Sequence, residues 1–177
     1  MTSVQEGNNI TLSCNASGKP GPVIAWTKVG SSQVLSHTSL LSVVNVSRPE
    51  TADNMIQYQC KASNGVKTPA TATVNVTVHF PPDIDHALSA YQVVEGSGLI
   101  LFCNATGNPK PNITWTKQGN NSELSTSETL TLSKLTREDD GSVFECTAQN
   151  YITSVKVMAV LTVWCKYWEF FPVFSLQ

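Results

Sequence analysis

Apolar and polar residues alternate along most of this chain with a period of two. The segment ITLSC, which begins at Ile10, places its aliphatic residues and its cysteine on one side and its hydroxyl residues on the other. The segment TATVNVTV, which ends at Val78, alternates over its whole length. Such runs, separated by Gly, Pro, Asn and Ser, are typical of antiparallel strands with one buried face. The pattern therefore predicts an all-β protein built from sandwiched sheets.

One long stretch of sequence occurs twice. NASGKPGPVIAWTK begins at Asn15 and NATGNPKPNITWTK begins at Asn104, 89 residues later, and each copy follows a cysteine directly. This spacing is too long for a solenoid repeat and suits two small domains. Between them, the paired prolines of HFPPDID favour an extended, stiff connection. We predict a first domain over residues 1–79, a proline-rich linker over 80–85 and a second domain over 86–164.

Four of the five cysteines form one pair in each repeat. Cys14 and Cys60 are 46 residues apart, and Cys103 and Cys146 are 43 residues apart. There is no C-x-x-C pair, so neither a zinc site nor a thioredoxin-like site is indicated. One widely spaced pair in each domain predicts one disulfide per domain and an oxidising compartment.

A tryptophan and an aromatic residue accompany each cysteine pair at matching positions. The two sets are Cys14, Trp26, Tyr58 and Cys60, and Cys103, Trp115, Phe144 and Cys146. They resemble the core pattern of immunoglobulin domains. The short distance from tryptophan to second cysteine, with V-x-E-G and G-x-P-x-P nearby, is similar to the I-set type of neural cell adhesion molecules, nephrin-like proteins, hemicentins and growth-factor-receptor ectodomains.

The resemblance implies two tandem immunoglobulin-like β-sandwiches. Each would have one disulfide between its sheets, with Trp26 or Trp115 packed on that bridge. It also implies a corner hydrogen bond from the Tyr58 hydroxyl, which Phe144 lacks. Because this fold hosts many binding roles, the resemblance is more specific for structure than for function.

Seven N-x-S/T sequons point to an extracellular glycoprotein. The acceptors are Asn9, Asn15, Asn45, Asn75, Asn104, Asn112 and Asn120. The alternative is that they are ordinary surface residues of a strand-rich protein. The net charge of −2 and the pI near 5.9 argue against nucleic-acid binding, which needs a basic surface.

The sequence shows no catalytic constellation. The chain has three histidines and lacks the common hydrolase, metalloprotease and phosphate-binding motifs. The group His79, Asp83, Asp85 and His86 offers metal-ligating side chains near the linker, but we favour solvated residues there. We expect no cofactor, no metal and no enzymatic activity.

Both ends of the sequence suggest a fragment. MTSVQEG corresponds to part of a first strand and lacks the apolar core of a signal peptide. Residues 165–177 form an atypical aromatic tail, too interrupted to span a bilayer. Cys165 would pair with another chain or with a further domain, or the tail is an artefact of the gene model. We expect membrane attachment only through a missing part of the chain.

The two repeats differ in their outward-facing positions. The first repeat is polar there, whereas the second has the apolar residues Ile100, Phe102, Val143, Met158 and Val160. We predict that Val143, Met158 and Val160 form a protein-contact face. The alternative is cover by a neighbouring loop or domain. A glycan at Asn112, expected on the same sheet, would oppose this contact.

These observations predict an extracellular or cell-surface module, or a secreted one, that acts by binding another protein. Cell–cell adhesion or recognition is the role that the resemblance favours, with the same chain or a different protein as partner. One alternative is the ligand-binding ectodomain of a signalling receptor with a kinase or phosphatase part. Another is a repeat of a structural matrix protein.

Overall fold

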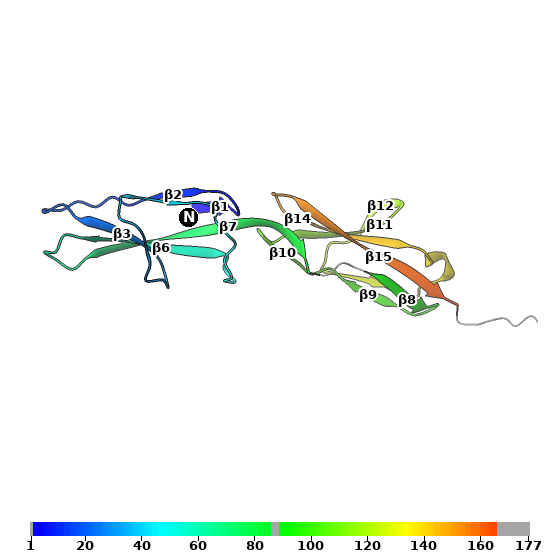
Figure 1. Cartoon of the computed structure of the whole chain (residues 1–177). Coiled ribbons are helices and arrows are strands. Elements are labelled where there is room, and N and C mark those ends of the chain that lie inside the picture. The colour runs from blue at the N-terminus through cyan, green and yellow to red at the C-terminus, as the bar shows by residue number, and fades with distance from the viewer. Residues whose placement is uncertain (1, 86–88, 166–177) are drawn as a thin grey trace, which may run out of the picture. The chain divides into compact units, whose positions relative to one another are not determined.

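The computed structural model describes residues 2–85 and 89–165, except for the side chain of Asn121. The chain divides into two compact units, Met1–Phe80 and Pro81–Gln177. Within the described residues every regular element is a strand apart from the short 3-10 helix η1 (Arg137–Asp139) (Figure 1). The fold is therefore all-β, as the alternation predicts.

The first unit contains a larger sheet and a two-stranded sheet. The larger sheet has the order β1-β7-β6-β3-β4, and β2 pairs with β5 in the smaller one. β1 runs parallel to β7, whereas the other pairs are antiparallel. The strands are β1 (Thr2–Gln5), β2 (Ile10–Ser13), β3 (Val23–Lys28), β4 (Val34–Ser36), β5 (Leu40–Val43), β6 (Met55–Ser63) and β7 (Ala70–Ile84).

The second unit repeats this arrangement. Its larger sheet has the order β12-β11-β14-β15-β8, with β8 parallel to β15, and its smaller sheet pairs β13 with β9. The strands are β8 (Ala90–Val94), β9 (Leu99–Phe102), β10 (Ala105–Asn108), β11 (Asn112–Lys117), β12 (Asn120–Ser125), β13 (Thr129–Leu132), β14 (Val143–Gln149) and β15 (Ser154–Trp164).

Strand β7 continues through the paired prolines and ends at Ile84, so most of the predicted linker 80–85 is strand. Its last residues belong to the second unit. There β10 pairs with β7, and Gly107 lies against Pro82, where an added Cβ would come 3.3 Å from the Pro82 Cα. Proline suits this segment because it tolerates extended backbone at the margins of a sheet.

In each unit a disulfide joins the two sheets across the core. Cys14 follows β2 and bonds to Cys60 in β6, and Cys103 follows β9 and bonds to Cys146 in β14. These bonds confirm the predicted one disulfide per domain. The matching aromatic residues are all buried in the two cores: Trp26, Tyr58, Trp115 and Phe144.

The corner hydrogen bond expected from Tyr58 is not formed. The described residues provide no hydrogen-bond partner for the Tyr58 hydroxyl, so this expectation is wrong. The Tyr58 side chain packs in the first core, and burial raises the pKa of its phenol. Tyr58 and Phe144 therefore have the same role, because each packs in the core of its unit together with the disulfide.

Candidate protein-contact site

Val143 and Val160 stand directly opposite each other on β14 and β15. Their neighbours Phe144 and Ala159 point into the core, so both valines face outward. Met158 lies two residues before Val160 on the same face and pairs with Glu145. Met158 is 49% exposed and Val160 is 42% exposed, whereas Val143 is half-buried. The structure thus brings the three predicted residues together into one outward apolar cluster, which we call the β14–β15 face.

The turn between β11 and β12 borders this face. Gly119 adopts a φ of 83°, which glycine reaches without strain and which allows the chain to reverse there. Just before it, the Gln118 amide donates to the Val143 carbonyl oxygen at 2.8 Å. Between this turn and the side chains of Val143, Lys156 and Met158 lies an open hollow of about 220 Å³.

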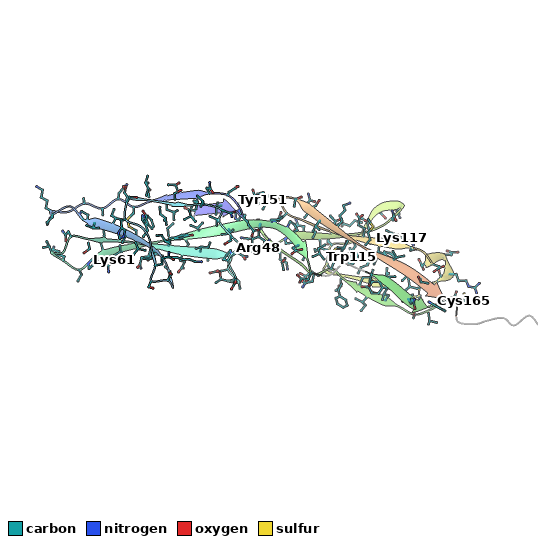
Figure 2. All side chains as sticks on the ribbon, in the orientation of Figure 1. Arg48, Lys61, Trp115, Lys117, Tyr151 and Cys165 are labelled. Carbon is teal, nitrogen blue, oxygen red and sulfur yellow. A yellow bond between two sulfur atoms is a disulfide. The ribbon has the colours of Figure 1, made fainter. Side chains whose placement is uncertain are left out.

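One ion pair lies on the β14–β15 face, and a second lies on the core-facing side of the same sheet. Lys156 Nζ lies 2.7 Å from Glu145 Oε1, beside Met158. Lys117, which Figure 2 labels, pairs with Phe144 and therefore lies on the core-facing side of the sheet. Its Nζ lies 3.3 Å from Asp139 Oδ1 and 5.6 Å from the centre of the Phe144 ring. The pKa of Asp139 is lowered, first because the Thr136 backbone amide donates to its carboxylate and then because of Lys117. The apolar cluster therefore has one charged pair at its border, Lys156 with Glu145.

The apolar surface extends further along the same sheet than the sequence reasoning foresaw. Trp164 of β15 pairs with Val94 of β8, and both side chains are at least half exposed. Polar Thr162 and Gln92 separate this pair from Val160. The alternation of these residues with buried Val163 was a usable signal, but only the parallel register of β8 and β15 places Val94 beside Trp164.

The first unit carries polar residues at the equivalent place. Gln57 of β6 pairs with Asn75 of β7, in the same relation to the disulfide and core as Val143 and Val160. Asn75 is also the acceptor of the sequon Asn75-Val76-Thr77. The two units thus share a scaffold and differ on this face, which is polar in the first unit and apolar in the second.

The other sequon asparagines are exposed: Asn9, Asn15, Asn45, Asn104, Asn112 and Asn120. Asn75 is half-buried. Asn112 faces outward on β11 opposite Gln149, six residues along β14 from Val143. That offset corresponds to about 20 Å of strand. A glycan at Asn112 would therefore be attached at the far end of the sheet from the β14–β15 face.

The remaining candidates lie elsewhere. Ile100 and Phe102 are exposed on β9, in the other sheet of the second unit. Of the proposed metal-ligating group, His86 lies outside the described residues, and the residues that are described contain no cluster of three or more potential ligands.

Cys165 is exposed and has a free thiol, and the rest of the tail, 166–177, lies outside the described residues. No helix in the described part of the chain is long and apolar enough to cross a membrane.

A family model for the immunoglobulin domain matches residues 1–64 and 81–150, which covers most of each unit. The chain belongs to the immunoglobulin domain family. This membership agrees with the paired sheets, the inter-sheet disulfides and the buried tryptophans, and it confirms the family resemblance and the predicted fold.

The chain is similar to parts of longer proteins. The chain is 32% identical over 168 residues to Brother of CDO from Homo sapiens, covering 89% of this chain and 15% of that protein. It is 34% identical over 158 residues to neuronal growth regulator 1 from Gallus gallus, covering 83% of this chain and 43% of that protein. This immunoglobulin chain thus spans less than half the length of these two relatives.

A solved structure of Dpr11 Ig1 bound to DIP-gamma contains a chain of the same fold. It matches with a TM-score of 0.70 at 22% identity, over 92% of this chain and 94% of that chain. At this identity the match shows the shared two-domain immunoglobulin fold.

Proposed function

We propose that this chain is an extracellular protein-binding module used in recognition or adhesion at the cell surface, and that the β14–β15 face is its contact site. The observation that carries the proposal is the Val143–Val160 pair, which replaces the Gln57–Asn75 pair of the first unit. An exposed apolar cluster on one of two otherwise matched domains is a local addition to the scaffold, and such clusters mark contact sites.

The composition of the β14–β15 face suits a protein partner. Val143, Met158 and Val160 supply apolar area at the centre, and the Lys156–Glu145 ion pair supplies polar groups at the border. Protein interfaces combine an apolar, desolvated centre with a polar rim in this way. Methionine adds a flexible side chain that adapts to the shape of a partner.

Known proteins support the same class of function. In the Dpr11–DIP-gamma structure, an immunoglobulin domain of one protein is bound to another protein of this fold. We infer that the present chain also takes a protein as its ligand and acts by non-covalent binding rather than catalysis. Seven sequons and two disulfides favour an extracellular or secreted location.

A single substitution tests the contact site. Val160→Asn completes an N-x-T sequon with Leu161 and Thr162, which is the arrangement that Asn75 has in the first unit. A glycan attached there would cover the β14–β15 face. Beads coated with the glycosylated chain should aggregate if the partner is the same chain. A panel of purified cell-surface ectodomains tests other partners. We expect Val160→Asn to abolish the binding found in either assay.

Two controls make this result specific. Val160→Asn combined with Thr162→Ala changes the valine without creating a glycosylation acceptor. If Val160→Asn alone loses more binding than this double variant, the additional loss must come from the glycan. Asn75→Gln removes the acceptor at the matching place of the first unit and should leave binding intact. Undiminished binding by a Val160→Asn chain with proven glycan occupancy would show that the contact site lies elsewhere.

The second candidate function is the ligand-binding ectodomain of a signalling receptor or a matrix repeat. The match to Brother of CDO, of which this chain covers 15%, leaves room for a much longer parent protein. Binding to a soluble ectodomain without bead aggregation would favour the receptor. Loss of that binding in the glycosylated Val160→Asn chain would still place the contact on the β14–β15 face.

A further inference from the structure

Phe102 is one of the most exposed large apolar side chains of the second unit, with 65% of its surface accessible. It lies on the outward side of β9, in the sheet opposite the β14–β15 face. Single exposed apolar residues are common and need no explanation by themselves. Here, however, the acceptor asparagine of the sequon Asn104-Ala105-Thr106 follows two residues later.

The burial pattern places Phe102 and Asn104 on the same side of the chain. Leu101 and Cys103 are buried, whereas Phe102 and Asn104 are exposed. Residues two apart on an extended backbone lie about 7 Å from each other on one face. A sugar ring attached to the Asn104 side chain is therefore within reach of the Phe102 ring.

Asp85 holds the Asn104 side chain in place. Asn104 Nδ2 donates to Asp85 Oδ2 at 3.0 Å, and the Asp85 amide donates to the Asn104 carbonyl oxygen at 3.3 Å. Glycosylation by a polyprenyl-diphosphate oligosaccharide forms a C1–Nδ2 bond, breaks the C1–O bond to the diphosphate and releases one Nδ2 proton. The other N–H remains, so the hydrogen bond to Asp85 is compatible with a glycan.

We propose that the first N-acetylglucosamine of a glycan on Asn104 packs on the ring of Phe102 and covers it. One face of this sugar is lined by C–H bonds whose hydrogens carry partial positive charge. The face of an aromatic ring is its negative side, so the two faces attract each other. The contact also removes apolar area of Phe102 from water. The outward side of β9 is then a glycan-covered surface, distinct from the β14–β15 face.

The first unit provides an internal comparison. Its sequon Asn15-Ala16-Ser17 follows Cys14 just as the second follows Cys103, but Ser13 stands where the second unit has Phe102. Ser13 and Asn15 are both exposed. The first unit therefore has the acceptor without the aromatic platform, and we expect its glycan to make no equivalent contact.

A double-mutant cycle tests the proposal in the full chain produced by glycosylating cells. The four proteins are the parent, Phe102→Ser, Thr106→Ala and the double variant. Thr106→Ala removes the sequon but leaves Asn104 and its bond to Asp85. Site occupancy is measured by glycopeptide mass spectrometry and Tm of the second unit by calorimetry. Phe102→Ser should lower Tm by about 3–8 °C in the glycosylated protein and by much less in the Thr106→Ala background.

Endoglycosidase H trims high-mannose glycoforms to a single N-acetylglucosamine. This trimming should preserve the Tm difference between the parent chain and Phe102→Ser, because the first sugar makes the contact. Ser13→Phe should raise the Tm of the first unit only when Asn15 is glycosylated. The proposal is wrong if Asn104 is unoccupied, or if Phe102→Ser lowers Tm equally with and without the glycan. The inference needs a glycan at Asn104 but no protein partner, so its failure would leave the β14–β15 face proposal standing.

Discussion

The indole nitrogen Nε1 of Trp115 donates a hydrogen bond to the carbonyl oxygen of Ser127 at 3.1 Å. The matching Trp26 of the first unit is also buried, but its Nε1 has no hydrogen-bond partner among the described residues. Both tryptophans pack beside a disulfide in the core of their unit. The two copies of the repeat therefore use the same aromatic residue with different hydrogen bonding.

This difference predicts unequal costs for the same substitution. Trp115→Phe leaves a cavity and also deprives the Ser127 carbonyl of its donor. Trp26→Phe leaves a similar cavity but removes an unsatisfied buried donor, which itself costs about 1–3 kcal/mol. We expect Trp115→Phe to be the more destabilising by about that amount. Hydrogen exchange resolved by peptide, which reports each unit separately, measures it; equal losses in the two units would contradict the prediction.

The two disulfides should differ in their rate of reduction. Cys14 is partly exposed and borders an open hollow of about 200 Å³, whereas Cys103 and Cys146 are both buried. Thiol–disulfide exchange requires the attacking thiolate to reach a sulfur atom. Under native conditions a small dithiol should therefore reduce Cys14–Cys60 several-fold faster than Cys103–Cys146. Quenched alkylation and mass spectrometry follow both bonds, and the difference should vanish in denaturant.

The stability of the second unit should depend on the ionisation of Asp139. Hydrogen bonding from the Thr136 amide, together with Lys117, lowers its pKa from the ordinary 3.8. A lowered pKa in the folded state adds stability above pH 3.8 that is lost as the pH falls through the lowered value. Asp139→Asn should therefore reduce the stability of the second unit at pH 7. The difference in stability between the parent chain and this variant should become smaller in acid.

Glu128→Gln provides the control for Asp139→Asn. Glu128 forms an exposed ion pair with Lys110, and such pairs contribute little to stability. The two variants can be compared by hydrogen exchange of the β14 amides at pH 7 and below pH 3.8. If the stability lost in the Asp139→Asn variant is the same at both pH values, ionisation of the Asp139 carboxylate does not cause the pH dependence of the stability.

The sequence predicted the features that depend on the local alternation of apolar and polar residues. Period two placed Cys146 inward and Val143 outward, and the repeated cysteine spacing predicted both disulfides. The sequence could not predict contacts that depend on pairing between strands far apart in the chain. Val94 meets Trp164 only through the register of β8 on β15, and the missing partner of Trp26 Nε1 depends on where a distant carbonyl group lies. The hydrogen bond from the Gln118 amide to the Val143 carbonyl oxygen likewise joins residues far apart in the sequence.

Arg48 should stabilise the first unit more than an ordinary surface ion pair does. Its guanidinium lies 3.1 Å from Glu6 Oε2 and 4.0 Å from the centre of the buried Phe80 ring, and its amide donates to Glu6 Oε1. A planar guanidinium can stack on the ring while it binds the carboxylate, which an ammonium group does less well. Arg48→Lys should therefore cost about 1 kcal/mol of unfolding free energy.

Lys110→Met removes an ion pair that is far more exposed, with 77% of the Lys110 side chain accessible, and it should change stability very little. Hydrogen exchange in β1 and β7 reports the effect of Arg48→Lys, because Glu6 follows β1 and Phe80 lies in β7. If raising the salt concentration to about 1 M removed the whole difference between the parent chain and the Arg48→Lys variant, screened charge attraction alone would explain it. We expect most of the difference to persist, since stacking on the buried ring is short-range and less sensitive to salt than attraction between exposed charges.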